Sequence, residues 1–93
     1  MKVSVKFFAQ LRDLTGKKTA IEFNLDEGAT ISLLLEELYL DSKIKKHMLD
    51  ENHQINSDIT ILRNGREIKF LEGMDTILNS GDEISIFPLV VGG

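Results

Sequence analysis

One segment of this sequence has apolar residues at helical spacing, and it limits the possible folds more than any other feature. Ile31, Leu34, Leu35 and Leu38 follow the i, i+3, i+4, i+7 pattern, and Thr30 is placed to cap the first turn. A single helix cannot bury its apolar face alone. We therefore expect it to pack across one face of a sheet in a two-layer α+β domain.

The segments around this helix alternate between apolar and polar residues, as strands buried on one face do. Two such segments precede the helix and three follow it, with their apolar members within residues 3–7, 21–25, 59–61, 68–70 and 84–86. Asn64-Gly65 suits a two-residue hairpin turn before the return strand that carries Ile68 and Phe70. The order predicts a β-grasp, the ubiquitin-like arrangement, with the first and last strands side by side at the centre of a mixed sheet.

The length of 93 residues predicts one domain over residues 1–93, ending in a flexible tail at 89–93. Between the helix and the third strand, residues 41–58 are mainly polar. Ile44, Met48 and Leu49 are the candidate anchors of a second short helix there. The composition of residues 41–58 does not indicate their role.

The charge and the cysteine content exclude several functions. A net charge of −4 argues against nucleic acid and against an anionic membrane surface as partners. The chain has no cysteine, so it has no thiolate metal site and carries no thioester or persulfide on its own side chains. It also lacks a signal peptide and an apolar run long enough for a membrane helix. These features predict a cytoplasmic protein.

Two aromatic residues fall on the wrong face of the predicted sheet. Strict alternation places Phe8 and Phe87 on the open face of the two neighbouring central strands, where a one-layer sheet is normally polar. A β-bulge that turns one of them inward, or coverage by a loop residue such as Leu11, would remove the anomaly. Otherwise the two rings form an exposed patch that docks a partner.

The sequence shows no catalytic machinery. His47 and His53 are six residues apart, which is unsuitable for two metal ligands on one helix face, and we interpret both as solvated. Glu36-Glu37 and Asp50-Glu51 are interpreted as charge pairs on exposed surfaces. No nucleophile elbow or phosphate-binding glycine loop is present. We expect a protein that is not itself an enzyme and binds no metal or cofactor.

The C-terminus is the most unusual part of the chain. After Pro88 come three apolar residues, Leu89, Val90 and Val91, and then Gly92 and Gly93. An extended tail from Pro88 to Gly93 would reach roughly 17 Å. Because glycine has no Cβ, the last two residues can enter a narrow channel and present an unhindered terminal carboxylate to a partner. The apolar residues before them suit an apolar groove or an exposed strand edge.

Most of the chain resembles the MoaD-like sulfur carriers, which are relatives of ubiquitin. The stretches that carry the resemblance are VKFFAQLRDLTG (5–16), EGATISLLLEEL (27–38), NGREIKFLEG (64–73) and SGDEISIFPLVVGG (80–93). The closing motif is the most specific of them. Residues 41–58 resemble the longer variants of the family, which have extra structure after the helix.

The resemblance implies a mechanism. An adenylating enzyme of the ubiquitin-activating type uses ATP and magnesium to adenylate Gly93, and a sulfur donor then converts the end into a thiocarboxylate. The large subunit of molybdopterin synthase uses that sulfur to build the dithiolene of the molybdenum or tungsten cofactor. Phe8, Arg12 and Phe87 match family positions in the docking patch, with Pro88 next to it. The tail departs from the usual motif at Leu89 and Val91.

Three functions stay open at this point. The chain is either a sulfur carrier, acting as the small subunit of a molybdopterin synthase, or a ubiquitin-like modifier joined through Gly93 to lysines of target proteins. The activation step is common to both, so the tail does not separate them. The third alternative is a β-grasp interaction module with an idle tail.

Overall fold

The computed structural model describes residues 1–15 and 20–88. Its strands form one mixed sheet in the order β2-β1-β5-β3-β4. The strands are β1 (Lys2–Phe7), β2 (Ile21–Asn24), β3 (Ile59–Arg63), β4 (Arg66–Glu67) and β5 (Glu83–Pro88). The helices are α1 (Ile31–Leu38) and α2 (Ser42–Met48), and the 3₁₀ segments are η1 (Ala9–Thr15), η2 (Ile68–Phe70) and η3 (Gly73–Asp75).

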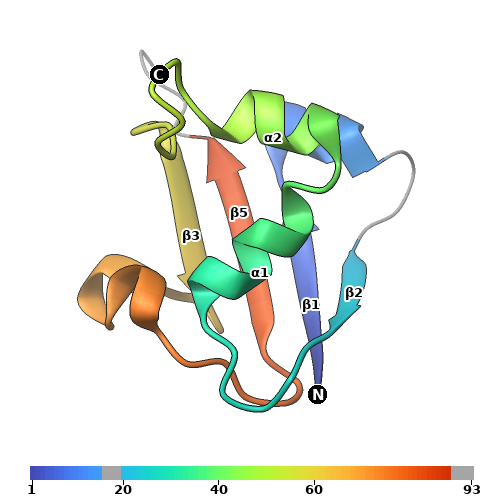
Figure 1. Cartoon of the computed structure of the whole chain (residues 1–93), viewed down its shortest axis with the longest axis vertical. Coiled ribbons are helices and arrows are strands. Elements are labelled where there is room, and N and C mark those ends of the chain that lie inside the picture. The colour runs from blue at the N-terminus through green and yellow to red at the C-terminus, as the bar shows by residue number, and fades with distance from the viewer. Residues whose placement is uncertain (16–19, 89–93) are drawn as a thin grey trace.

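The predicted β-grasp is confirmed. β5 lies parallel to β1 and antiparallel to β3, so the first and last strands are neighbours at the centre of the sheet. In Figure 1, α1 crosses the face of the sheet, and α2 lies on the same side near the end where β5 finishes. The other face of the sheet carries no helix of the described chain.

The helix α1 forms where its spacing predicted. The Thr30 side chain accepts a hydrogen bond from the Leu33 amide, at 3.3 Å, and so caps the first turn. The four residues of the apolar stripe are all buried. They pack on the inward-facing residues of the central strands. The core consists of Val3, Val5, Phe7, Leu11, Ile31, Leu34, Leu35, Leu38, Ile44, Met48, Ile61, Ile68, Leu78, Ile84 and Ile86.

The expected second helix is present as α2. Asp41 caps it, since one carboxylate oxygen accepts from the amides of Lys43 at 2.9 Å and Ile44 at 3.3 Å. Ile44 and Met48 are buried, as anchors of this helix should be, and Leu49 is half-buried. The polar residues between them face solvent. Residues 42–48 are therefore an integral part of the core layer.

The hairpin turn also forms as expected. Asn64 and Gly65 have φ angles of 49° and 85°, the left-handed pair that an Asn-Gly turn favours. The prediction that the return strand continues to Phe70 is wrong. β4 ends at Glu67, and Ile68 to Phe70 turn into the 3₁₀ segment η2. A 3₁₀ turn buries Ile68 but points Phe70 outward, where it is 80% exposed, whereas a strand would have placed both on one face.

Candidate functional site

The open face of the sheet carries an aromatic pair at the end where β5 finishes. The rings of Phe8 and Phe87 meet edge to face, with their centroids 5.5 Å apart and their planes at 75°. Phe8 is 41% exposed and Phe87 is half-buried. We call these two residues the aromatic pair.

Strand register explains how the pair forms. Phe7 lies beside Ile86 in the parallel ladder of β1 and β5, and both are buried on the helix side. The Phe8 amide donates to the Ile86 carbonyl at 3.0 Å, so the chain keeps its alternation for one more residue and turns Phe8 to the open face. Ala9, with a φ of 53°, then starts η1. No bulge reverses either ring.

Leu11 does not cover the aromatic pair. It is 3% exposed and belongs to the core cluster. Coverage of the aromatic pair by Leu11 is therefore ruled out. Arg12, which follows it in η1, is exposed to solvent.

Sequence reasoning missed one member of this face. Leu62 of β3 lies opposite Ser85 in the ladder with β5, next to the pair of Thr60 and Phe87. Leu62 is half-buried, and Glu67 of β4 is its partner on the other side. Alternation along β3, with Ile61 inward, would have placed Leu62 outward beside Phe87. The open face thus has an apolar strip of Phe8, Phe87 and Leu62, with Glu67 at its border.

Pro88 closes the ladder. Its Cα lies opposite Ile59, the first residue of β3, and Pro88 is half-buried. The predicted tail, Leu89, Val90, Val91, Gly92 and Gly93, lies outside the described residues. The described chain therefore ends one residue after Phe87 of the aromatic pair.

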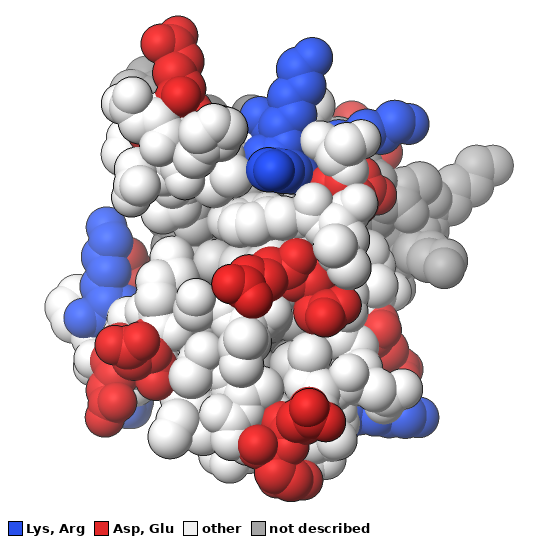
Figure 2. Space-filling view, in the orientation of Figure 1, with Lys and Arg blue, Asp and Glu red and all other residues white. Residues whose placement is uncertain are grey.

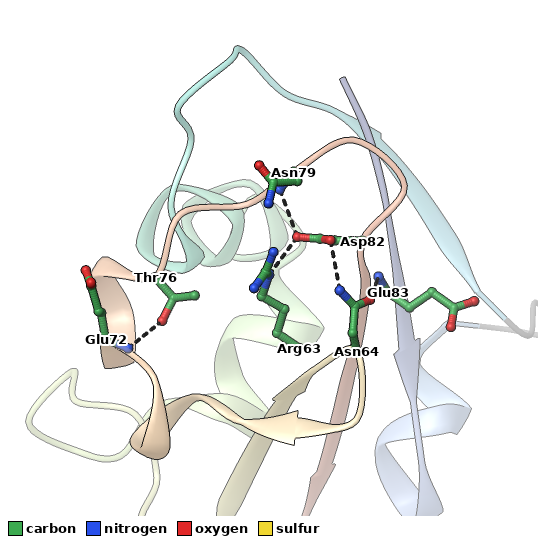
Figure 3. A network of polar contacts seen from close by, with 7 residues as sticks. All are labelled: Arg63, Asn64, Glu72, Thr76, Asn79, Asp82 and Glu83. Carbon is green, nitrogen blue, oxygen red and sulfur yellow. Dashed lines mark hydrogen bonds and ion pairs between the residues drawn. The ribbon is translucent and has the colours of Figure 1, made fainter.

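A polar network around the buried Asp82 carboxylate lies at the other end of β5 (Figure 3). The Asp82 carboxylate accepts from Arg63 Nε at 2.7 Å, from Asn64 Nδ2 at 2.9 Å and from the Asn79 amide at 2.8 Å. The Asn64 side-chain oxygen in turn accepts from the Glu83 amide at 2.9 Å. These bonds join the β3–β4 turn to the start of β5.

The network also determines the charge state of Asp82. Burial by itself raises the pKa of this carboxyl, but hydrogen bonds from Asn79, Arg63 and Asn64 and the positive charge of Arg63 lower it by more. The pKa of Asp82 therefore lies below its ordinary value. The carboxylate is ionised at neutral pH and holds the turn in place.

The remaining polar residues do not assemble into a catalytic or metal site within the described chain. His47 and His53 are exposed, and His47 Nδ1 is 2.8 Å from the Lys43 carbonyl oxygen. No group of three or more histidine, aspartate or glutamate side chains among residues 1–15 and 20–88 is arranged to hold a metal. Figure 2 shows acidic side chains over α1 and basic ones over α2 on the helix side.

The family model described as the ThiS family matches residues 5–93, which is nearly the whole chain. The chain belongs to this family. It is 36% identical over 93 residues to small archaeal modifier protein 3 of Haloferax volcanii, covering all of both chains. It is 35% identical over 68 residues to an Archaeoglobus fulgidus protein provisionally named a sulfur carrier, covering 72% of this chain and 77% of the relative.

The solved structures agree on the fold of this family member. The crystal structure of small archaeal modifier protein 1 (SAMP1) from Haloferax volcanii superposes with a TM-score of 0.86 at 24% identity, covering 100% of both chains. The resemblance to ubiquitin-like carriers is thus confirmed at the level of family and fold. In the part of the chain that the structure describes, no helix has the length and apolar character needed to cross a membrane.

Proposed function

We propose that this chain is a carrier protein whose C-terminal carboxylate, at Gly93, is activated by a partner enzyme and then receives sulfur. The observation that carries this proposal is the position of the aromatic pair. Two large rings lie beside Leu62 on the sheet face away from the helices, and Phe87 is followed directly by Pro88, the last described residue before the diglycine tail. A partner that buries these rings would hold the start of the tail in a fixed position.

Activation would occur in the partner's site, because the described chain has no phosphate site or nucleophile of its own. An oxygen of the Gly93 carboxylate attacks the α-phosphorus of ATP, pyrophosphate leaves, and magnesium held by the partner neutralises the phosphates. A sulfide-level donor then attacks the carbonyl carbon and displaces AMP. The product is a thiocarboxylate at Gly93.

The expected destination of the sulfur is the dithiolene of a molybdenum or tungsten cofactor. In that role the chain is the small subunit of a molybdopterin synthase, and the larger subunit takes the sulfur from Gly93. The support for this assignment is the resemblance of the closing motif and of Phe8, Arg12 and Phe87 to the MoaD-like carriers. Leu89 and Val91 require a partner channel wide enough for branched apolar side chains.

The second candidate is protein modification. A lysine amine of a target protein would attack the activated carbonyl of Gly93 and form an isopeptide bond, releasing AMP or a carrier thiol. Full-length similarity to small archaeal modifier protein 3 favours this alternative. Both candidates share the adenylation step, so they are compatible in one protein.

ATP–pyrophosphate exchange with the cognate activating enzyme tests the shared step. The native chain should support exchange, and a chain lacking Gly93 should not, although it still folds and docks. Equal exchange rates would overturn both candidates. The intact mass of protein from its native cell then separates them, because sulfur-for-oxygen replacement indicates the carrier role and glycine-glycine remnants on lysines of other proteins indicate modification.

A further inference from the structure

The outer side of the helix layer carries two exposed leucines. Leu33 of α1 is 49% exposed, and Leu40, in the turn between α1 and α2, is 81% exposed. The two residues are seven apart in sequence, which is about two helical turns, and the buried stripe of α1 faces the other way, onto the sheet. In Figure 1, no helix or strand of the described chain passes in front of α1. This side of the helix layer is therefore open to a partner.

Acidic residues surround Leu33. Glu36 and Glu37 are exposed in the last turn of α1, and together with Asp26 and Glu27 they line a hollow of about 270 Å³. Within the described residues, none of these four carboxylates is in an ion pair. Negative charge at a helix C-terminus is unfavourable, because the carbonyl end of the helix dipole is also negative. A cationic group placed in the hollow would offset this cost.

Basic residues follow on α2. Lys43, Lys45 and Lys46 are exposed, and none of them forms an ion pair within the part of the chain that the structure describes. Lys45 and Lys46 line a second hollow, of about 280 Å³, together with Asp50, whose carboxylate already accepts hydrogen bonds from two backbone amides. Figure 2 shows both regions from one side, acidic over α1 and basic over α2. We call this surface, with the two exposed leucines, the helix face.

We propose that the helix face binds a second copy of the chain across a two-fold axis. In a two-fold contact the same surface meets itself, so a face with both signs of charge side by side is complementary to itself. The acidic hollow of each copy receives Lys45 and Lys46 of the other, at two symmetric places. Leu33 and Leu40 are buried between the copies, and their apolar contact adds the attraction that exposed ion pairs alone do not supply.

The charge pattern favours a second copy over an unrelated partner. A partner surface of one sign would be attracted by one half of the helix face and repelled by the other half, whereas a second copy matches both. Each copy has a net charge of −4, so two copies repel each other at a distance, and each exposed ion pair contributes little. We therefore expect a dimer that dissociates on dilution.

Such a dimer leaves the aromatic pair accessible. Phe8 and Phe87 lie on the sheet face away from the helices, so two copies that meet through their helix faces present both pairs outward. The dimer uses none of the residues that activation at Gly93 requires. Its absence would therefore leave the proposed function standing, and failure of pyrophosphate exchange would leave the dimer standing.

Charge exchange tests the proposal by sedimentation equilibrium, from about 10 μM to about 1 mM protein, where weak dissociation constants are measurable. One variant carries Glu36→Lys and Glu37→Lys, and a second carries Lys45→Glu and Lys46→Glu. The average mass of the native chain should rise with concentration from that of one chain toward that of two. Each variant alone should dimerise at least about tenfold more weakly, because like charges then face each other. An equimolar mixture of the two variants should regain the native association, since every reversed patch then meets one of opposite sign.

The matched control carries Glu22→Lys and Glu83→Lys. These two exposed carboxylates flank Ser4 in the ladders of β1, so they lie on the open face of the sheet, away from the helix face. The control brings the net charge from −4 to 0, as the reversal of Glu36 and Glu37 does, so it separates the effect of location from that of net charge. It should dimerise at least as tightly as the native chain.

Three results would refute the dimer. They are a native chain that stays monomeric over the whole range, charge-reversed variants that associate as well as the native chain, and a mixture that associates no better than its components. If a charge-reversed variant fails to fold, Leu40→Ser decides instead, because it removes an exposed side chain without changing the charge. This substitution should weaken the native dimer at least about fivefold, and unchanged affinity would equally refute the proposal.

Discussion

Phe7 and Phe8 are neighbours in sequence on opposite faces of the sheet, and they provide a matched pair of substitutions. Phe7 is 4% exposed in the core, whereas Phe8 is 41% exposed and touches Phe87. We predict that Phe7→Ala damages folding and spares the docking surface. Phe8→Ala should do the opposite.

The magnitudes follow from burial. Removing the Phe7 ring leaves a cavity in the core and should lower the free energy of unfolding by about 3–5 kcal/mol. This is a large share of the roughly 5–15 kcal/mol that stabilises an ordinary domain. Removing the Phe8 ring exposes little new surface and loses one aromatic contact, so it should cost about 0.5–1.5 kcal/mol.

Two measurements check the pair. Urea unfolding gives the stability of each variant, and calorimetric titration with the activating enzyme gives its affinity. At a temperature where both variants are folded, Phe8→Ala should weaken docking by more than about 1 kcal/mol, or roughly fivefold, and Phe7→Ala should not. If Phe8→Ala destabilised the fold as much as Phe7→Ala, or left docking unchanged, the aromatic pair would not be a docking surface.

Three further substitutions test the framework that supports the site. Asp82→Asn should lower stability by about 2 kcal/mol at pH 7 in urea unfolding. The folded-state pKa of Asp82 is depressed, so the ionised carboxylate contributes its stabilisation fully above the unfolded pKa of about 3.9. This stabilisation is lost as the pH falls through the folded-state pKa. The difference in stability between the native chain and Asp82→Asn should therefore shrink at pH 3. If the stability difference were the same at pH 7 and pH 3, or if the exposed control Asp58→Asn had an equal effect, the Asp82 network would not stabilise the fold. Met48→Ala should cost about 2–5 kcal/mol, since the side chain is fully buried, and a negligible loss would mean that α2 is not part of the core. Asp41→Ala should cost about 1 kcal/mol by removing the cap of α2, measurable as a lower thermal midpoint, whereas an unchanged midpoint would show that the cap is dispensable.

Local patterns predicted most of the fold because the relevant forces are local in sequence. The helical stripe, the alternating strands and the Asn-Gly turn each specify backbone geometry within a few residues. The wrong prediction, a strand through Phe70, came from alternation alone. Ile68 and Phe70 match a strand pattern, but Ile68 and Leu71 also match the three-residue repeat of a 3₁₀ turn, and Leu71 is half-buried. Alternation within so short a segment does not separate the two.

The candidate site was predictable only where it depends on patterns that are local in sequence. Alternation alone located the aromatic pair, because β1 and β5 are regular up to their ends. An apolar cleft beside β3 was not predictable, since it depends on where Ile55 and Met74, from segments far apart in sequence, meet the edge of the sheet. The early end of β4 also decides whether that edge is open. Such features depend on tertiary packing and not on periodicity.

The register of β5 connects the two ends of the site. β5 pairs on both sides, so its residues cannot shift without breaking two ladders, and the Asp82 network fixes the start of the strand against the β3–β4 turn. A shift of one residue would move Phe87 to the core face and carry Ile86 outward, because strand side chains alternate. It would also move Pro88 away from its place opposite Ile59. The buried carboxylate before β5 therefore acts together with the two ladders, from the far end of the strand, to fix the exposure of Phe87 and the position of Pro88, which precedes the tail that carries Gly93.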